Sequence, residues 1–242
     1  MIGKIIDKKE VAQGTLQVVF ETNEPFTFKA GQYCFVTLKN PPYPDDRGNK
    51  RHFSIVNSPN KKGIITATTR LRDSGFKKSL KELPIGTEVE LGPIAGSFTL
   101  PDEKDRPLVF IAGGIGITPF MSMLRYVFEQ KLPYKITLNY SNRDQDSTAY
   151  LDELQNYQLP IPRLHSGQAT NYQLILTMTE DTEWAGEKRR INAQFIKDYI
   201  TDLNGYSYLV VGPPPMVEAI EKALKEAGVE QSNIKIENFT GY

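Results

Sequence analysis

The spacing of apolar residues changes near the middle of this 242-residue chain. In the first hundred residues, short runs such as 16–20 alternate apolar and polar side chains, and Gly- and Pro-rich turns separate them, which is typical of strands. After the charged, proline-bounded stretch 101–107, apolar runs such as 108–112 alternate with amphipathic stretches such as 119–130. Two periods in one chain predict two domains, which we place at residues 1–102 and 103–242.

Each half indicates its own fold class. In the first half we expect strands at 16–20, 33–38, 64–71 and 88–91 and a helix at 77–83. Short strands at this spacing favour a six-stranded antiparallel β-barrel. In the second half we expect strands at 108–112, 135–140, 174–178, 208–211 and 234–236 and helices at 119–130, 149–156, 193–200 and 216–227. This alternation predicts a doubly wound α/β domain with a parallel sheet.

Composition excludes several function classes. The 29 Lys and Arg residues balance 29 Asp and Glu residues, so no strong field favours nucleic acid or an anionic membrane. One cysteine rules out a disulfide framework and a four-cysteine iron–sulfur site, and the distant His52 and His165 offer little to a metal, so no metal site is expected. The chain shows neither a signal peptide nor ~18 uninterrupted apolar residues, so we expect a cytoplasmic protein without a membrane span.

Two turns of the second half have features of a nucleotide site. Between a strand and a helix, the turn 113–119 carries Gly114, Gly116, Thr118 and Pro119. Glycines let a backbone approach a pyrophosphate, and the helix start offers free N–H groups. The turn 211–216, with Gly212, Pro213, Pro214 and Met216, opens the last helix in a similar way. Each turn alone could serve packing only, but two at one sheet edge favour ligand binding.

The end of the second parallel strand bears on nucleotide choice. Ser141, Asn142 and Arg143 stand where an NAD-selecting site often places an acidic residue. An arginine there could hold a 2′-phosphate through charge-assisted hydrogen bonds, which favours NADPH over NADH. The alternative is an ordinary solvated arginine in a loop.

The barrel half offers a second candidate site. Arg51, His52, Phe53 and Ser54 combine an arginine fork, an aromatic face and a hydroxyl, although an ordinary strand could also carry them. The segment that joins the next strand to the helix at 77–83 could bind an anion at the helix start, or could simply cap a surface helix. Its candidate ligands are Thr69, Arg70, Ser74, Gly75, Phe76 and Ser79.

Together these motifs resemble the ferredoxin–NADP reductase family of flavoproteins, from about Gly31 to Phe239. Residues 51–54 resemble its Arg-x-Tyr-Ser flavin motif, 75–79 its Gly-x-x-Ser region with one more residue between, 113–119 and 212–216 its two nicotinamide-nucleotide turns, and 236–239 its carboxyl-terminal Glu-x-aromatic. Departures are Phe53 in place of tyrosine and Val211 where many relatives carry cysteine.

The resemblance implies FAD in the barrel and NADPH or NADH in the second domain. Arg51 would bind the FAD pyrophosphate, Phe53 would stack on the isoalloxazine, and the catalytic Ser54 would lie near flavin N5. His52, Thr69, Arg70, Ser74, Gly75, Phe76 and Ser79 would complete the flavin site. The catalytic Glu237 would lie close to the nicotinamide, and Phe239 or Tyr242 would shield the other flavin face.

The implied function is an oxidoreductase that passes electrons from NAD(P)H through FAD to a separate acceptor. Ferredoxin, flavodoxin, an oxygenase component and a small oxidant are the candidate acceptors. A basic patch could dock an acidic carrier protein, or could merely solvate the barrel; its members are Lys61, Lys62, Arg70, Arg72, Lys77 and Lys78. The alternatives are an electron-transfer subunit that does not turn over by itself and a free-flavin reductase.

Overall fold

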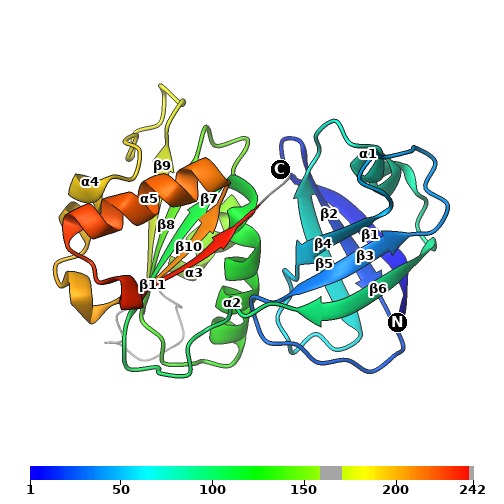
Figure 1. The fold of residues 1–242 in the computed structure, drawn as a ribbon, viewed down its shortest axis with the longest axis horizontal. Coiled ribbons are helices and arrows are strands. Elements are labelled where there is room, and N and C mark those ends of the chain that lie inside the picture. Colours follow the sequence, from blue (N-terminus) through cyan, green and yellow to red (C-terminus); the bar gives the residue numbers. More distant parts are fainter. Residues whose placement is uncertain (159–170, 240–242) are drawn as a thin grey trace. The chain divides into compact units, whose positions relative to one another are not determined.

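The computed structural model describes residues 1–158 and 171–239. The chain divides into two compact units (Figure 1). Among the described residues, the first consists of Met1–Leu100 together with Thr118–Lys131, and the second consists of Pro101–Ile117 together with 132–158 and 171–239. Each unit has a hydrophobic core of its own.

The first unit contains a six-stranded antiparallel sheet. Its strands are β1 (Ile2–Ala12), β2 (Thr15–Glu21), β3 (Tyr33–Leu38), β4 (Lys50–Ser54), β5 (Ile64–Arg70) and β6 (Glu88–Ala95), in the order β4-β3-β6-β1-β2-β5. The two edge strands, β4 and β5, also contact each other, and just past β4 the Val56 N–H donates to the Thr66 carbonyl at 2.9 Å. The sheet therefore curls toward closure, which confirms the expected barrel architecture.

Strand β1 has no counterpart among the expected strands. It lies inside the sheet, between β6 and β2, although only Gly3 and Ile5 among its residues are buried. Register shifts between Ile5 and Asp7 and between Glu10 and Ala12 interrupt its pairing with β2. Because most of its side chains are polar or charged, the strand lacks the apolar alternation by which strands are recognised.

Helix α1 (Gly75–Glu82) begins two residues earlier than expected. Ser74 caps it, because the Ser74 hydroxyl accepts the Lys77 N–H at 3.3 Å. Phe76 and Leu80 point from α1 into the barrel core, each 1% exposed. A serine cap ahead of a short amphipathic stretch thus fixes the start of the helix.

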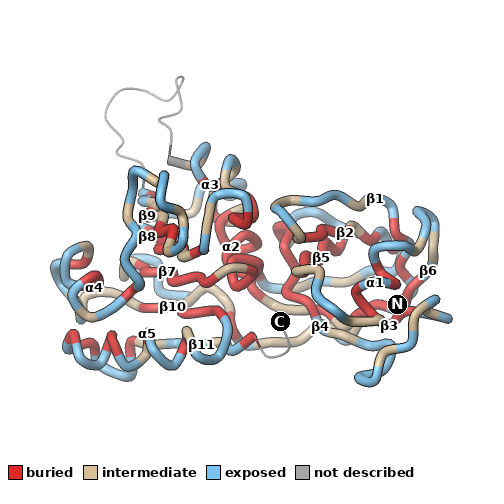
Figure 2. Tube along the Cα trace, turned by 90° about the horizontal axis from the view of Figure 1, so that it is seen from above, coloured by how far each residue is buried: buried red, intermediate tan, exposed pale blue. Residues whose placement is uncertain are grey.

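The second unit contains a five-stranded parallel sheet with helices. Its strands are β7 (Leu108–Gly113), β8 (Ile136–Asn142), β9 (Tyr172–Met178), β10 (Ser207–Gly212) and β11 (Ile234–Asn238), in the order β11-β10-β7-β8-β9. Every residue of β7 is buried, and Figure 2 shows the trace of β7 and β10 largely in the buried colour. The chain extends the sheet in one direction from β7 and returns to β10 on the other side of β7, so the strand order reverses between these two strands. This topology confirms the doubly wound α/β class.

The remaining helices follow the expected ones within a few residues. They are α2 (Ile117–Glu129), α3 (Leu151–Gln158), α4 (Ala193–Tyr199) and α5 (Pro214–Ala227), with short 3₁₀ turns at Gly114–Gly116, Leu203–Gly205 and Gln231–Asn233. Helix α5 starts on prolines, where no N–H partner is needed, and ends at Gly228, whose φ of 104° is left-handed. Across the described residues, no helix is long and apolar enough to span a membrane.

Candidate functional site

The two predicted nucleotide turns meet at the point where the strand order reverses. They follow β7 and β10, which are neighbours in the parallel sheet. A Cβ on Gly116 would lie 2.5 Å from the Val211 carbonyl oxygen, and one on Gly113 would collide with the Met216 sulfur. Gly116 is therefore required for the close packing of the two turns, which is the structural role that the sequence left open as the alternative to ligand binding. Ligands of open α/β sheets bind at this same edge.

A buried tyrosine at the end of β8 holds the first turn. The Tyr140 hydroxyl donates toward the carbonyl oxygens of Gly114 at 3.1 Å and Ala149 at 3.4 Å. Tyr140 is fully buried, and Gly114 has a φ of 53°, which favours glycine. Sequence reasoning missed Tyr140, which only the adjacency of β7 and β8 brings to the turn.

Asn142 carries polar atoms that nothing in the described chain satisfies. Its side chain is 5% exposed, and neither Oδ1 nor Nδ2 has a hydrogen-bond partner among the described residues. Ser141 beside it is half-buried, and Arg143 is exposed, with no ion pair to any described carboxylate. Buried polar groups are normally hydrogen-bonded, so an unpartnered amide at this edge fits a site that takes a polar ligand.

Glu237 presents a second unsatisfied polar group. It pairs in register with Val211 on the neighbouring β10, and its Oε2 is buried without a partner. Burial raises the pKa of Glu237 to about 7, against the opposing charge of Lys235. A carboxyl group in this condition can hold or release a proton near neutral pH.

The other residues predicted for the nucleotide site differ in exposure. Thr118 and Pro119 are buried at the start of α2, Gly212 is buried, Pro213 and Pro214 are exposed, and Met216 is half-buried. The Phe239 ring is 8% exposed, and its N–H donates to the Gly212 carbonyl at 3.0 Å, which ties the chain after β11 to the proline turn. Tyr242 lies outside the described residues.

In the first unit, Arg51 is engaged by its own loop. Its Nη2 donates to Asp45 Oδ1 at 2.5 Å, and its Nη1 donates to the carbonyl oxygens of Arg47, Gly48 and Lys50 at 2.8–3.0 Å. The Arg51 side chain is 13% exposed. The sequence predicted that the Arg51 guanidinium binds an anionic ligand. In the structure its anionic partner is the carboxylate of Asp45.

Asp45 is a residue that sequence reasoning missed. Its Oδ2 accepts the Ser74 hydroxyl at 2.7 Å and the Phe76 N–H at 2.9 Å, at the start of α1. Chiefly the Phe76 N–H, then Ser74, the Arg47 N–H and the Arg51 charge, hold the pKa of Asp45 far below its usual range. The groups that converge here form an anion site, and a carboxylate satisfies them.

Lys77 adds positive charge beside this anion site. It is 6% exposed, and burial, followed by the charges of Arg72, Arg47 and Arg51, lowers its pKa to about 8. Lys77 therefore cannot belong to an exposed patch that docks a carrier protein, which corrects that part of the expectation. A buried ammonium next to arginines instead suits a phosphate.

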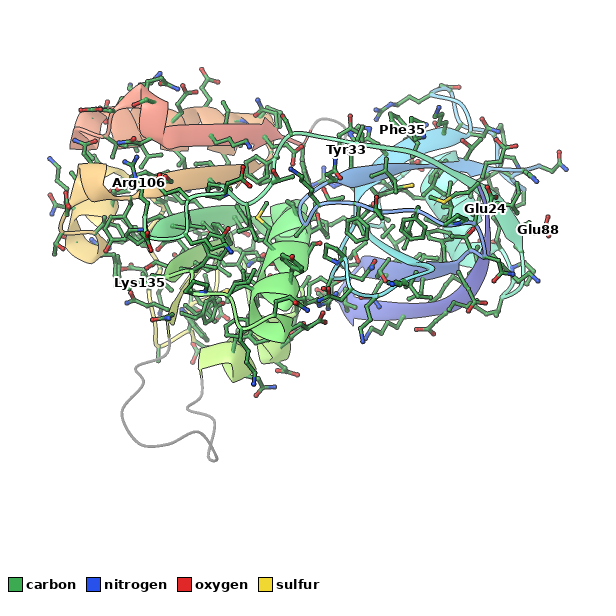
Figure 3. All side chains as sticks on the ribbon, turned by 90° about the horizontal axis from the view of Figure 1, so that it is seen from below. Glu24, Tyr33, Phe35, Glu88, Arg106 and Lys135 are labelled. Atoms are coloured by element: carbon green, nitrogen blue, oxygen red, sulfur yellow. The ribbon has the colours of Figure 1, made fainter. Side chains whose placement is uncertain are left out.

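Phe53 lies in the barrel core. It is 3% exposed, and its ring centroid is 6.0 Å from that of Phe76. The accessible rings belong to the opposite face of β3 and β4, where Tyr33, Phe35 and His52 pack together, two of them labelled in Figure 3. Stacking of a flavin on Phe53 stays a prediction, and it requires the side chains that cover the ring to move.

The remaining residues predicted for the flavin site differ in exposure. Ser54 is 7% exposed, Thr69 1% and Ser79 0%, whereas Arg70, Ser74 and Gly75 are half-buried and His52 is exposed. Ser79, Ser74 and Gly75 lie together along α1, and Ser54 and His52 are neighbours of Arg51 on β4. The structure thus gathers the α1 residues around Asp45, and Arg51 joins them from β4.

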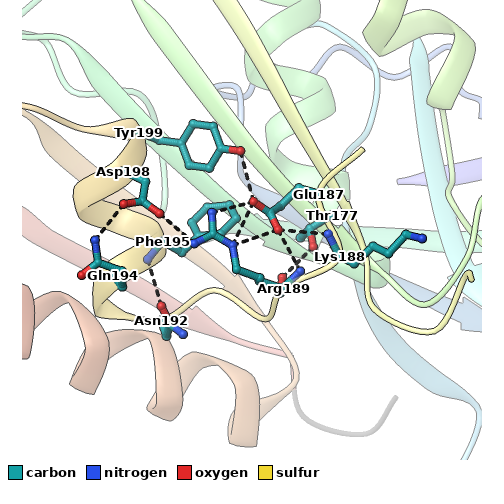
Figure 4. Close-up of polar contacts among 9 residues, drawn as sticks. All are labelled: Thr177, Glu187, Lys188, Arg189, Asn192, Gln194, Phe195, Asp198 and Tyr199. Carbon is teal, nitrogen blue, oxygen red and sulfur yellow. Dashed lines mark hydrogen bonds and ion pairs between the residues drawn. The ribbon is translucent and has the colours of Figure 1, made fainter. Parts of the chain in front are cut away.

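A polar network follows β9 and was also missed (Figure 4). Arg189 binds Glu187 through Nε and Nη2 and binds Asp198 through Nη1 at 2.7 Å. The backbone carbonyl of Glu187 also accepts a hydrogen bond, at 3.0 Å, from the Met178 N–H at the end of β9. Hydrogen bonds from Arg189 lower the pKa of Glu187 to about 2, although its partial burial acts in the opposite direction. The network anchors the segment after β9 to α4.

Comparisons with known proteins agree with this architecture. The family model of the oxidoreductase NAD-binding domain matches residues 110–222. The anthranilate 1,2-dioxygenase electron transfer component of Acinetobacter baylyi is 29% identical over 88% of this chain and 58% of its own length. The phenol 2-monooxygenase reductase component DmpP of a Pseudomonas species is 25% identical over 99% of this chain and 64% of its own length. The chain thus spans less than two thirds of both relatives.

A solved structure shows the same fold over its full length. The ferredoxin NADP⁺ reductase from Neisseria gonorrhoeae, solved with bound FAD and NADP, superimposes with a TM-score of 0.79 at 18% identity, covering 98% of each chain. Its barrel-plus-parallel-sheet architecture is the one described above. Residues 110–222 are thus similar to oxidoreductase NAD-binding domains, most of the chain is similar to the electron transfer and reductase components of two oxygenases, and its fold is that of the solved reductase.

Proposed function

We propose that this chain is an oxidoreductase that takes electrons from NAD(P)H and passes them through bound FAD to a separate acceptor. The observation that carries the proposal is the convergence of two glycine turns with two buried, unpartnered polar groups, Asn142 and Glu237, at one sheet edge. Such groups cost stability unless a ligand satisfies them. Residues 103–242 would hold the nucleotide and residues 1–102 the flavin.

The residues present fit both cofactors. Bound FAD would supply the carrier that accepts a hydride from the nicotinamide and releases electrons to the acceptor. Arg51, the Ser74 hydroxyl and the Phe76 N–H already form a site for an anionic oxygen, which suits the flavin pyrophosphate. Ser54 would lie near the flavin ring, and Glu237, with its pKa of about 7, would orient the nicotinamide or hold a proton beside it.

Nucleotide choice would depend on Arg143. Its guanidinium is exposed at the carboxyl end of β8 and has no described carboxylate partner, so it is available to a 2′-phosphate. We therefore propose NADPH as the preferred donor. Replacing Arg143 with alanine should raise the KM for NADPH and leave the KM for NADH unchanged. An equal effect on both KM values would show that Arg143 does not discriminate between the two nucleotides.

The acceptor would be a separate redox partner. Two similar proteins are named as an electron transfer component of a dioxygenase and a reductase component of a monooxygenase. The single cysteine of these 242 residues, Cys34, is buried, so they hold no cysteine set for an iron–sulfur relay. An oxygenase component is accordingly the acceptor we favour, and a cytoplasmic location stays a prediction.

An anaerobic absorption spectrum of the purified protein tests the proposal. We expect a flavin band that is bleached by stoichiometric NADPH or NADH and restored by an artificial acceptor. A protein that takes up no FAD on reconstitution, or whose flavin stays oxidised with both donors, would contradict it. Bleaching without turnover would instead support the non-autonomous subunit.

One observation favours a second candidate, a free-flavin reductase in which flavin is a substrate. Asp45 holds the donors that would otherwise bind the pyrophosphate, which is compatible with loosely bound flavin. Gel filtration of the FAD-loaded protein distinguishes the two. Flavin that co-elutes supports the tightly bound cofactor, and flavin that separates supports the substrate.

A further inference from the structure

The anion site of the first unit is filled by the chain itself. Asp45 accepts hydrogen bonds from Arg51, from the Ser74 hydroxyl and from the Phe76 N–H. Arg51 and Ser74 are among the residues assigned above to the flavin phosphates. Carboxylate and phosphate oxygens use the same donors, so one set of donors cannot serve both at once.

The loop that carries Asp45 closes against the rest of α1. The Tyr43 N–H donates to the Ser79 hydroxyl oxygen at 3.1 Å, and a Cβ on Gly75 would collide with the Pro44 carbonyl oxygen. Residues 43–45, which we call the Asp45 loop, thus lie against Gly75 and Ser79, two further residues assigned to the flavin. The loop occupies the start of α1 by backbone contacts as well as by its carboxylate.

Arg51 is bound by the Asp45 loop and by the residues that follow it. The two terminal nitrogens of Arg51 carry all but one of its N–H donors, and both donate to residues 45–50. A pyrophosphate that needs the flat fork of Arg51 must therefore replace the carboxylate of Asp45. Displacement is favourable only if the incoming anion interacts more strongly than the one that leaves.

The surrounding charge favours the stronger anion. Arg72, Arg47 and Arg51 lie close enough to Lys77 to lower its pKa, and the one negative charge that opposes them there is that of Asp45. A pyrophosphate diester carries two negative charges and more acceptor oxygens than a carboxylate. These cations can thus exchange the Asp45 carboxylate for the pyrophosphate, and the cost of displacing Asp45 lowers the affinity for the ligand.

We propose that Asp45 is an internal competitor of the flavin pyrophosphate: its carboxylate occupies Arg51 and the N-terminus of α1, and FAD binds by displacing it. Asp45 is then the residue that sets how tightly the protein holds flavin. This inference rests on the proposed function, in which Arg51 and α1 hold the FAD phosphates. A residue that only supported the site would strengthen FAD binding, whereas Asp45 is proposed to weaken it.

The test is the dissociation constant of FAD, measured by flavin fluorescence on the FAD-free protein. Asp45→Asn should bind FAD on the order of tenfold more tightly than wild type, because the competing state is lost. Asp46→Asn is the matched control, since it removes the same charge from an exposed neighbour, and its affinity should stay within about twofold. Unchanged or weaker binding by Asp45→Asn, or an equal gain in Asp46→Asn, would overturn the proposal.

A second measurement needs no variant. Trypsin cuts after Arg47, which lies in the polar segment that Asp45 holds against α1. FAD should speed this cleavage in the wild-type protein because displacement releases the segment, and slower or unchanged cleavage would count against displacement. If neither wild type nor Asp45→Asn binds FAD, the proposed function fails; if both bind it equally, only the competitor role fails.

Discussion

The two candidate sites of this protein are opposite in how their polar groups are satisfied. In the first unit, Asp45 accepts hydrogen bonds from Arg51 and from the N-terminus of α1. In the second unit, Asn142 and Glu237 keep buried polar atoms without any described partner. An engaged site gains stability and gives up ligand affinity, whereas an unsatisfied site loses stability and gains affinity. Removing a polar side chain should therefore lower stability in the first site and raise it in the second.

The largest expected effect is the removal of the cation in the engaged site. Arg51→Ala leaves the Asp45 carboxylate, whose side chain is 10% exposed, without its ion pair. Breaking a buried pair from one side should lower the free energy of unfolding by about 3 kcal/mol. Urea denaturation of the FAD-free protein measures this loss. The exposed Arg47→Ala should change stability by less than about 0.5 kcal/mol, and an equal loss in both would show that the pair does not stabilise the loop.

The next effect tests whether the second site is rigid despite its unsatisfied groups. Gly116→Ala places a Cβ 2.5 Å from the Val211 carbonyl oxygen, so the two turns must separate. We expect a stability loss of about 2 kcal/mol and weaker nucleotide binding. Thermal unfolding and calorimetric titration with NADPH measure the two. Pro215→Ala, at an exposed position of the second turn, is the control; a harmless Gly116→Ala would mean that the turns do not depend on close packing.

The third variant should stabilise the protein. Asn142→Leu replaces a buried, unpartnered amide with an apolar side chain of similar shape, which should raise the free energy of unfolding by about 1 kcal/mol. The same change should weaken NAD(P)H binding, because the ligand loses its amide partner. The exposed Asn156→Leu should produce neither change. A destabilised Asn142→Leu would indicate that the amide has a partner in solution and would weaken the contrast between the sites.

The smallest effect is a pH dependence. The pKa of Glu237 is about 7 in the folded protein and 4.5 in the reference state, so the folded protein holds the proton more strongly between these values. This group's contribution to stability is therefore present below pH 4.5 and is lost as the pH rises through about 7. Between pH 5 and 7 the free energy of unfolding should fall less in Glu237→Gln than in wild type, by about 1 kcal/mol, because solvent screens the partly exposed carboxyl. Thermal unfolding at the two pH values measures the difference. An exposed control, Glu230→Gln, should keep the wild-type slope.

The fold was largely readable from periodicity, and the exception is instructive. The buried strands β7 and β10 are recognisable in the sequence by their continuous apolar residues, and β3 has alternating burial along the strand. Strand β1 does not, because its burial is limited to Gly3 and Ile5 and its place in the sheet comes from pairing with β2 and β6. Backbone pairing contributes no side-chain pattern, so a polar strand inside a sheet is visible only in three dimensions.

By itself, the sequence determined the two fold classes, the glycine turns and the residues around which both candidate sites form, because turns and periodic burial are encoded locally. Only the tertiary structure decided what those residues contact. It brought Asp45 to Arg51 and to Ser74, which lies 29 residues further along the chain, and it placed Phe53 in the core. Contacts between distant segments depend on how strands pair and loops close, and a single-chain pattern does not record that geometry.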